Sequence, residues 1–183
     1  ARAYWRRRGL DDKTIVRFGL GYAPNDGQAL YQYLRDKGYN QQELDASGLF
    51  KRSQSGRIYC LFWKRVMTPI FDLRGNIIAF GGRVMDDSKP KYVNSPETLV
   101  YHKSETVFAM QIAKRSASRR FVLCEGYMDV ISMHQAGFTN AVASLGTALT
   151  SGHASLVKRY TQEVLLLYDS DEAGVKAALR AIP

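Results

Sequence analysis

The second half of the chain alternates between short apolar runs and amphipathic stretches, and this pattern restricts the possible folds more than any other feature. The apolar runs predict strands and the stretches after them predict helices, in the order 120–126, 128–137, 140–146, 150–160, 163–171 and 172–182. Strands that alternate with helices form a parallel sheet covered by helices. We therefore expect a parallel α/β sheet in this half of the chain.

The first half has a different pattern, in which short amphipathic stretches each end at a glycine. These stretches predict four helices, over 4–9, 11–19, 27–38 and 40–48. Asp11 is the expected N-cap of the second helix, and Gly38 is the expected left-handed residue after the third. This part of the chain is therefore expected to begin with helices.

From Val66 onward, the spacing of the apolar residues becomes that of β-strands. Two β-rich runs flank the turn residues 72–76, which predicts a hairpin over 66–84, and we expect the glycine pair Gly81–Gly82 to break its second run. The polar segment 86–98 contains two prolines and is expected to be a long exposed loop. A further helix is predicted over 105–118.

These patterns together define the fold class as α/β. We expect a mixed α+β basic subdomain over residues 1–113, followed by a partial parallel α/β sheet over residues 114–183, with the boundary between Lys103 and Ser118. Without later strands to continue this sheet, an edge or face of apolar residues is expected to remain uncovered, with association or partial disorder near residue 183.

Three carboxylates lie at the carboxyl ends of two predicted strands. Glu125 ends the first of these strands, and Asp169 and Asp171 end the last. If the two strands are neighbours, the three carboxylates converge at the sheet edge where ligands bind in such folds, and their repulsion favours a divalent cation. Oxygen ligands without a nearby histidine favour Mg²⁺ or Mn²⁺ over zinc. The alternative is that each residue simply caps the next helix.

The charge of the chain points to a polyanionic partner. The formal net charge is +9, and lysines and arginines near the polar segment 86–98 are interleaved with Tyr92 and Tyr101. Such an arrangement suits single-stranded nucleic acid, with cations on phosphates and rings beneath bases.

The cysteines and the apolar runs exclude other classes of site and protein. Cys60 and Cys124 have no paired neighbours, so neither zinc nor a disulfide is expected. No apolar run is long enough to span a membrane, and we expect a soluble, intracellular protein.

Several segments together resemble one family. The run Glu125–Asp129, followed by "ASLGT" and "YDSDEAG", resembles the Toprim module, and its form "EGYMD" is similar to bacterial replicative DNA primases of the DnaG type. The segments "GGRV", "PKYVNSPET", "HKSE" and "RRGL…IVRFGLGYAP" resemble the polymerase core of the same family. The resemblance covers nearly the whole chain.

The resemblance implies a nucleotidyltransferase, a DNA-directed RNA polymerase that makes short RNA primers from nucleoside triphosphates on single-stranded DNA during replication. It implies that Glu125, Asp169 and Asp171 form the catalytic, magnesium-binding cluster, with Asp129 as a further acidic position. Positions for the template strand or incoming nucleotide fall on Arg8, Arg83, Lys91, Tyr92, Asn94 and Lys103. It also implies a cytoplasmic, replisome-associated protein whose contact with the replicative helicase lies in a domain outside these residues.

The family has a further acidic Asp-x-Asp motif beyond the residues present here, so the chain is expected to be a piece of a larger primase with a truncated Toprim module. One alternative is therefore a core that only binds single-stranded DNA or nucleotides. Another is a different Toprim enzyme, a topoisomerase or nuclease, which would leave the segment "PKYVNSPET" unexplained. A phosphatase with Asp169 as nucleophile would need later motifs for which no residues remain.

Overall fold

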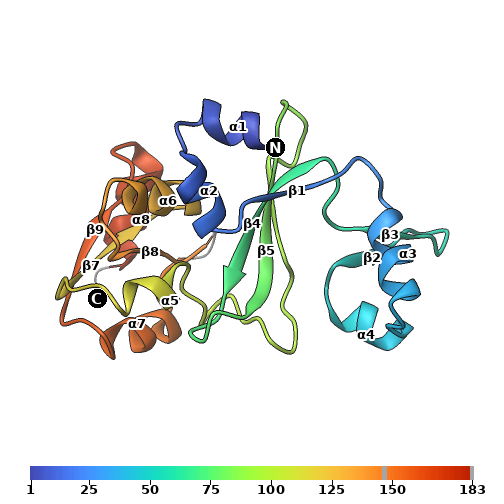
Figure 1. The fold of residues 1–183 in the computed structure, drawn as a ribbon. Helices are drawn as coiled ribbons and strands as arrows, with labels where there is room; N and C mark the ends of the chain where they lie inside the picture. The colour runs from blue at the N-terminus through green and yellow to red at the C-terminus, as the bar shows by residue number, and fades with distance from the viewer. Residues whose placement is uncertain (146–147, 182–183) are drawn as a thin grey trace.

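The computed structural model describes residues 1–145 and 148–181, and it has three parts arranged in a row (Figure 1). A four-stranded antiparallel sheet occupies the middle. A small unit made of α3, α4, β2 and β3 lies on one side of it, and the three-stranded sheet with its helices lies on the other. Among the described residues, no helix is long and apolar enough to cross a membrane.

The four helices predicted for the first part are all present. They are α1 (Arg2–Arg7), α2 (Asp12–Arg17), α3 (Ala29–Asp36) and α4 (Gln41–Ala46). Asp11 caps α2, because its carboxylate accepts a hydrogen bond of 2.7 Å from the amide of Thr14. Gly38 follows α3 with a left-handed φ of 92°, as expected for a residue without a Cβ.

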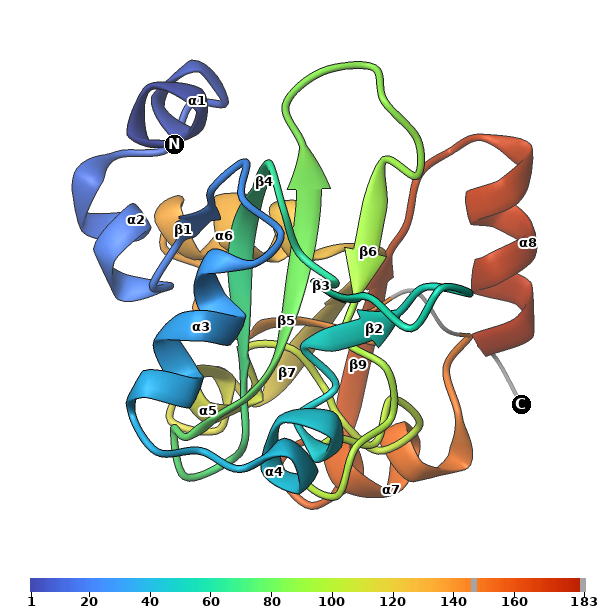
Figure 2. The same ribbon diagram turned by 90° about the vertical axis from the view of Figure 1, so that its right-hand side faces the viewer.

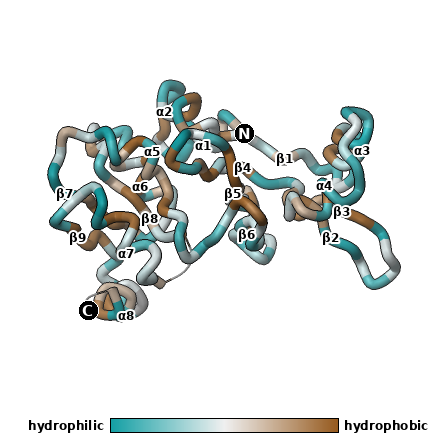
Figure 3. Tube along the Cα trace, turned by 90° about the horizontal axis from the view of Figure 1, so that it is seen from below, coloured by the Kyte–Doolittle hydropathy of each residue, from teal (hydrophilic) through white to brown (hydrophobic). Residues whose placement is uncertain are grey.

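The middle sheet contains the predicted hairpin and two strands that were not predicted. Its strands lie in the order β1 (Gly21–Ala23), β4 (Arg65–Phe71), β5 (Ile77–Val84) and β6 (Tyr92–Asn94), as Figure 2 shows. The expectation of a continuous exposed loop over 86–98 is thus wrong in part, because β6 pairs with β5. The short hairpin of β2 (Phe50–Arg52) and β3 (Ile58–Cys60) was also missed; its polar turn appears teal and white in Figure 3.

The glycine pair does not break the second run of the hairpin, which corrects that expectation. β5 continues through Gly81 and Gly82 to Val84 and pairs with strands on both sides. The reason for the glycines is space: a Cβ at Gly81 would lie 2.9 Å from the ring of Tyr127, and one at Gly82 would lie 2.8 Å from the ring of Phe62. The pair therefore admits two aromatic rings against the sheet.

We expect Gly81→Ala to lower the free energy of unfolding by about 1–3 kcal/mol, because the added methyl group overpacks the buried ring of Tyr127. Urea denaturation followed by circular dichroism measures this change. Gly21→Ala is the matched control, since a Cβ there meets no atom closer than 4.0 Å and should cost far less. An equal loss of stability in both variants would contradict the packing explanation.

The second half forms the predicted parallel sheet. Its elements are α5 (Met110–Ala113), β7 (Arg120–Cys124), α6 (Tyr127–Gln135), β8 (Ala141–Ala143), α7 (Ser151–Lys158), β9 (Glu163–Leu167) and α8 (Glu172–Ala181). The strand order is β8-β7-β9, and both pairs are parallel. The last residue of the predicted strand 140–146 and of the predicted helix 172–182, and Thr147 of "ASLGT", lie outside the described residues.

The helix predicted over 105–118 is much shorter in the structure. Ala109 adopts a left-handed φ of 61°, and the amide of Phe108 donates a 2.8 Å hydrogen bond to the carbonyl oxygen of Ala143. A left-handed residue cannot continue a right-handed helix, so α5 begins only at Met110. Phe108, which precedes α5, instead pairs with Ala143 of β8.

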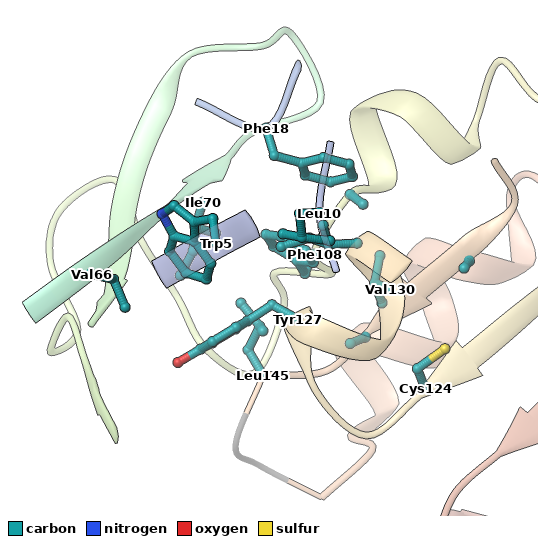
Figure 4. Packing of buried hydrophobic residues seen from close by; sticks show 14 of the residues in the cluster. Trp5, Leu10, Phe18, Val66, Ile70, Phe108, Cys124, Tyr127, Val130 and Leu145 are labelled. Atoms are coloured by element: carbon teal, nitrogen blue, oxygen red, sulfur yellow. The ribbon is translucent and has the colours of Figure 1, made fainter. Parts of the chain in front are cut away.

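One hydrophobic core joins the two halves of the chain. Figure 4 shows Trp5 from α1 and Val66 from β4 in the same cluster as Phe108, Tyr127 and Val130. These side chains are all less than 9% exposed. The antiparallel sheet and the parallel sheet are therefore packed against each other through one shared core. We expect them to unfold in a single transition.

β9, one of the two outer strands of the parallel sheet, keeps apolar side chains exposed, as expected. In β9, Val164, Leu165 and Leu167 are 39%, 44% and 49% exposed, and in α8 Val175 and Leu179 are 49% and 66% exposed. β9 pairs only with β7 within the described chain. An exposed apolar edge strand favours association.

Two buried histidines, His134 of α6 and His153 of α7, bond to backbone carbonyl oxygens of β8 and of the segment before α5. His134 donates from Nε2 to the carbonyl oxygen of Ala141 at 2.9 Å, and its Nδ1 is buried without a hydrogen-bond partner among the described residues. His153 donates from Nε2 to the carbonyl oxygen of Lys103 at 2.6 Å and accepts from the amide of Thr150. Burial lowers the pKa of both imidazoles.

These histidines predict a loss of stability in mild acid. Below the ordinary histidine pKa of about 6.5 the unfolded chain binds protons that the folded chain does not, so unfolding becomes easier as the pH falls. We expect urea denaturation at about pH 5.5 to give a lower free energy of unfolding than at about pH 7.5. His134→Gln should reduce this difference, whereas His102→Gln, at an exposed histidine, should preserve it. A pH-independent stability would refute the explanation.

Candidate active site at the ends of β7 and β9

Two of the predicted carboxylates meet where the central strand and the outer strand of the parallel sheet end. Glu125 directly follows β7, and Asp169 lies two residues beyond β9. The amide of Asp169 donates a 3.3 Å hydrogen bond to Oε1 of Glu125, which ties the two strand ends together. The adjacency on which the prediction depended is confirmed, since β7 and β9 pair over their whole length.

A glycine in α8 makes this approach possible. Gly174 packs so closely that a Cβ would overlap the carbonyl oxygen of Asp169 and lie 2.8 Å from Oε1 of Glu125. Its amide also donates a 2.8 Å hydrogen bond to Oδ1 of Asp171. The start of α8 is therefore seated directly on the strand ends.

The expected convergence of three carboxylates is not formed in this conformation, which corrects the prediction. Within residues 1–145 and 148–181, no group of three or more histidine, cysteine, aspartate or glutamate side chains is placed to hold a metal ion. Asp171 does not point along the strand with Asp169, because β9 already ends at Leu167 and α8 begins at Glu172. Asp171 caps the start of α8 instead, which is the alternative considered above.

Asp129 has a similar local role. Its Oδ2 accepts a 3.1 Å hydrogen bond from the amide of Gly126, which completes the first turn of α6. Asp129 nevertheless remains exposed and borders the same cavity as Glu125. One carboxylate oxygen therefore orders the turn after β7, and the side chain still contributes negative charge to the site.

A cavity of about 490 Å³ lies over these strand ends. It is lined by Arg8, Tyr92, Asn94, Glu125, Gly126, Tyr127, Met128, Asp129, Leu145 and Asp169. The residue after α1, two residues of β6, and residues that follow the three strands of the parallel sheet thus contribute to one concave surface. The cavity size falls within the range of small-molecule sites.

Asn94 presents an unused acceptor at this cavity. Its Oδ1 atom is buried and has no hydrogen-bond partner among the described residues. A buried amide oxygen without a partner is costly, and a donor from a bound molecule would satisfy it. Asn94 therefore fits a role in binding, as its position in the sequence implied.

Arg83 is held in place by two tyrosines rather than facing the cavity. Its Nε donates to the hydroxyl of Tyr92 at 3.1 Å, and its Nη1 donates to the hydroxyl of Tyr4. The guanidinium carbon lies 5.6 Å from the centroid of each ring. Arg83 thus fixes Tyr92, which is 45% exposed and does line the cavity.

Lys91 and Lys103 are outside the cavity wall. Lys91 is exposed, and its carbonyl oxygen accepts from the amide of Val84 and from Arg65. The backbone of Lys103 is bound to Glu97 and His153, and its ammonium group makes no hydrogen bond or ion pair with the described residues. Both side chains are therefore available to a ligand that extends beyond the cavity.

Two further residues, Arg65 and Tyr127, shape the site and were not predicted as site residues. Arg65 is only 7% exposed and donates to the carbonyl oxygens of Pro90 and Lys91, at 2.9 and 3.3 Å, so it anchors the segment before β6. Burial lowers the pKa of Arg65. Tyr127 packs against Tyr92 and Phe108, and burial raises its pKa. Tyr127 is part of the "EGYMD" run, whereas Arg65 lies just before the hairpin predicted over 66–84 and no sequence pattern marked it.

The donor set fits a divalent cation shared with a ligand. Glu125 and Asp169 are exposed carboxylates on one cavity, and neither forms an ion pair within the described chain. Mg²⁺ is commonly bound by one or two carboxylates together with phosphate oxygens of a substrate. The two side chains therefore suit such an ion, with the remaining ligands supplied by a bound nucleotide or by water.

Comparison with known proteins agrees with this architecture. The family model for the DNA primase catalytic core, N-terminal domain, matches residues 1–114, and the model for the Toprim domain matches residues 119–183. The chain belongs to the DNA primase family. The DNA primase of Clostridium acetobutylicum is 47% identical over 181 residues, which are 98% of this chain and 30% of that protein.

Solved primase structures have the same fold. The primase of Aquifex aeolicus, solved with its zinc-binding and RNA polymerase domains, matches with a TM-score of 0.92 and 40% identity over 100% of this chain and 46% of that one. A DnaG primase catalytic domain bound to ssDNA matches with a TM-score of 0.88 and 41% identity over 98% of this chain and 59% of that one. The chain thus spans about a third of the curated primases and about half of the solved chains.

Proposed function

We propose that this chain carries the nucleotide-joining site of a DNA primase, an enzyme that makes short RNA primers from nucleoside triphosphates on single-stranded DNA. One observation carries the proposal: Glu125 and Asp169 meet at a cavity that also contains Arg8, Tyr92 and Asn94, where the two primase modules pack together. Acidic, basic and aromatic side chains in one cavity suit a metal-bound triphosphate beside a nucleic acid strand.

The reaction joins two nucleotides by in-line displacement. The 3′-hydroxyl oxygen of the primer forms a bond to the α-phosphorus of the incoming nucleotide, the bond from that phosphorus to the bridging oxygen breaks, and pyrophosphate leaves. Glu125 orients the hydroxyl and accepts its proton. Asn94 accepts a hydrogen bond from the nucleotide, and Arg8 neutralises phosphate charge. A Mg²⁺ or Mn²⁺ ion held by Glu125 and Asp169 supplies charge stabilisation when bound.

The remaining predicted residues extend the proposal beyond the cavity. We assign Lys91 and Lys103 to phosphates of the template, Tyr92 to stacking on a base, and Arg83 to holding Tyr92. Asp171 and Asp129 are proposed as supporting acidic residues, and Asp171 would exchange its helix cap for the cation. We place the division between the modules after residue 113. In the bacterial cell the protein would act at the replisome, with the replicative helicase as its partner through another part of the primase.

In a second candidate function, residues 1–183 bind single-stranded DNA or nucleotides but do not join nucleotides. The observation that favours it is the position of Asp171, which caps α8, while Glu125 and Asp169 line the cavity. This candidate shares the binding surface of the first and differs only in whether nucleotides are joined.

Dinucleotide synthesis on a single-stranded template tests the proposal and separates the two candidates. Residues 1–183 and a complete primase that contains them are compared with Mg²⁺ or Mn²⁺ and with EDTA, and template binding is measured in parallel by fluorescence anisotropy. We expect metal-dependent product from the complete primase. Product from the complete primase alone identifies residues 1–183 as a binding core, whereas template binding without product in either protein contradicts the proposed synthesis.

A further inference from the structure

A second cavity lies at the far end of the β4–β5 hairpin from the candidate active site. Its volume is about 520 Å³, and it is bounded by the turn before β5, by α5 and the residues after it, and by Arg17 and Thr139. Figures 1 and 2 both show the end of this hairpin next to α5. The two cavities share no lining residue. Asn94 of the first cavity pairs with Gly81 within β5, whereas the second cavity borders Gly75, before β5 begins.

Three arginines border this cavity without any compensating charge. Arg17, Arg74 and Arg115 all line it, and none of their guanidinium groups forms a hydrogen bond or ion pair with a described residue. None of the lining residues is acidic. Like charges around one cavity repel each other, so the arrangement favours an anion between them.

The nearest carboxylate on the turn is already used by the turn itself. Oδ1 of Asp72 accepts from the amides of Arg74 and Asn76, each at 2.8 Å, and Oδ2 accepts from the side-chain amide of Asn76 at 2.9 Å. These hydrogen bonds lower the pKa of Asp72. The carboxylate therefore stabilises the turn that carries Arg74 and does not pair with the arginines.

The walls of the cavity are linked to each other by hydrogen bonds. The ammonium group of Lys114 donates to the carbonyl oxygen of Leu73 at 2.6 Å, which joins the end of α5 to the turn. The hydroxyl of Thr139 donates to Oγ of Ser116 at 3.2 Å, which joins the segment after α6 to the segment after α5. The arginines are thus carried by a preformed site rather than by independent loops.

The cavity also contains an unused acceptor. Gln111 lines it, and the Oε1 atom of Gln111 is buried without a hydrogen-bond partner in the described chain. Inorganic phosphate would pair with the arginines, but it carries no sugar hydroxyl to donate a hydrogen bond to this oxygen. A phosphorylated molecule that also carries hydroxyl groups would satisfy both.

We propose that this cavity is a binding site for a small phosphorylated sugar or nucleotide, separate from the site at Glu125 and Asp169. The phosphate lies among Arg17, Arg74 and Arg115, and a hydroxyl donates to Gln111. The cavity volume suits one such molecule. The proposal rests on this cavity alone and is independent of primer synthesis.

The site is tested by NMR titration with two probes, ribose 5-phosphate and inorganic phosphate. EDTA is present, and the backbone amide resonances of Gly75 and Ser116 report binding. We expect saturable shifts with both probes and tighter binding of ribose 5-phosphate. Arg74→Gln combined with Arg115→Gln should weaken both by at least about tenfold, and Gln111→Met should remove the preference for the sugar. Arg57→Gln, at an exposed arginine outside both cavities, is the control and should change neither affinity.

Three results would overturn the proposal. The first is the absence of saturable shifts. The second is an equal affinity in the arginine double variant, which would show that the phosphate is an adventitious ion only. The third is a response of these resonances to a single-stranded oligonucleotide but to neither small probe, which would make the cavity part of a nucleic acid track. Thermal unfolding of each variant shows whether the fold is retained, and because all three substituted residues are partly or fully exposed, we expect it to be.

Discussion

Glu125→Gln is expected to reduce metal-dependent primer synthesis by at least about 100-fold, which is the loss typical of removing one charge-stabilising group from an active site. Glutamine has nearly the same shape, so the hydrogen bond from the amide of Asp169 can be kept while the negative charge is lost. The variant then no longer accepts the proton of the hydroxyl and holds a cation weakly. Steady-state synthesis by the complete primase carrying the change measures the effect on kcat.

The control for this variant is Glu105→Gln, which removes the same charge at an exposed residue outside the cavity. Both variants should bind single-stranded template as tightly as the unchanged protein, because the proposed template contacts are on basic and aromatic residues. Full primer synthesis by Glu125→Gln would remove Glu125 from the catalytic role. A matching loss in Glu105→Gln would show instead that net charge governs the activity.

Trp5→Ala is expected to lower the free energy of unfolding by about 3–5 kcal/mol, the usual cost of deleting a buried aromatic ring. Trp5 is 2% exposed and lies in the cluster that joins α1, the antiparallel sheet and the parallel sheet (Figure 4). The cavity left behind therefore weakens both halves of the chain at once. Urea denaturation monitored by far-ultraviolet circular dichroism gives the free energy without relying on tryptophan emission.

The second tryptophan of the chain provides the control. Trp63 is 49% exposed, and Trp63→Ala should change the free energy of unfolding by no more than about 1 kcal/mol. Hydrogen exchange adds a second readout, since Trp5→Ala should also speed the exchange of the β7 amides, far away in sequence. Two separate unfolding transitions, or unchanged exchange in β7, would contradict the single shared core.

The features that depend on periodicity were predictable from the sequence. The alternation in the second half identified three strands and their helices, a parallel sheet brings strand ends to one edge, and the pairing of β7 with β9 met the condition that the two strands be neighbours. This reasoning brought Glu125 and Asp169 together correctly. The residue-level resemblance added Arg8, Tyr92 and Asn94, which also line the cavity.

The features that depend on exact element ends were not predictable. Asp171 was expected to share a face with Asp169, but β9 ends at Leu167, so alternation along a strand no longer applies there. β1, β2, β3 and β6 are each three residues long, too short to show a period. Gly81 and Gly82 depend on contacts with Tyr127 and Phe62, which are far away in sequence. The end of β9, the three-residue strands and the glycine contacts are set by tertiary packing, which local sequence patterns do not predict.

The strand order β8-β7-β9 has a consequence for how the protein is made. The hairpin of β4 and β5 closes over a five-residue turn and can pair as soon as residue 84 is synthesised, because its contacts are local. β7 lies in the centre of its sheet, however, and its second neighbour, β9, is completed only at Leu167. The ends of β7 and β9 therefore cannot come together before Leu167 is synthesised, and the cavity at Glu125 forms after the β4–β5 hairpin.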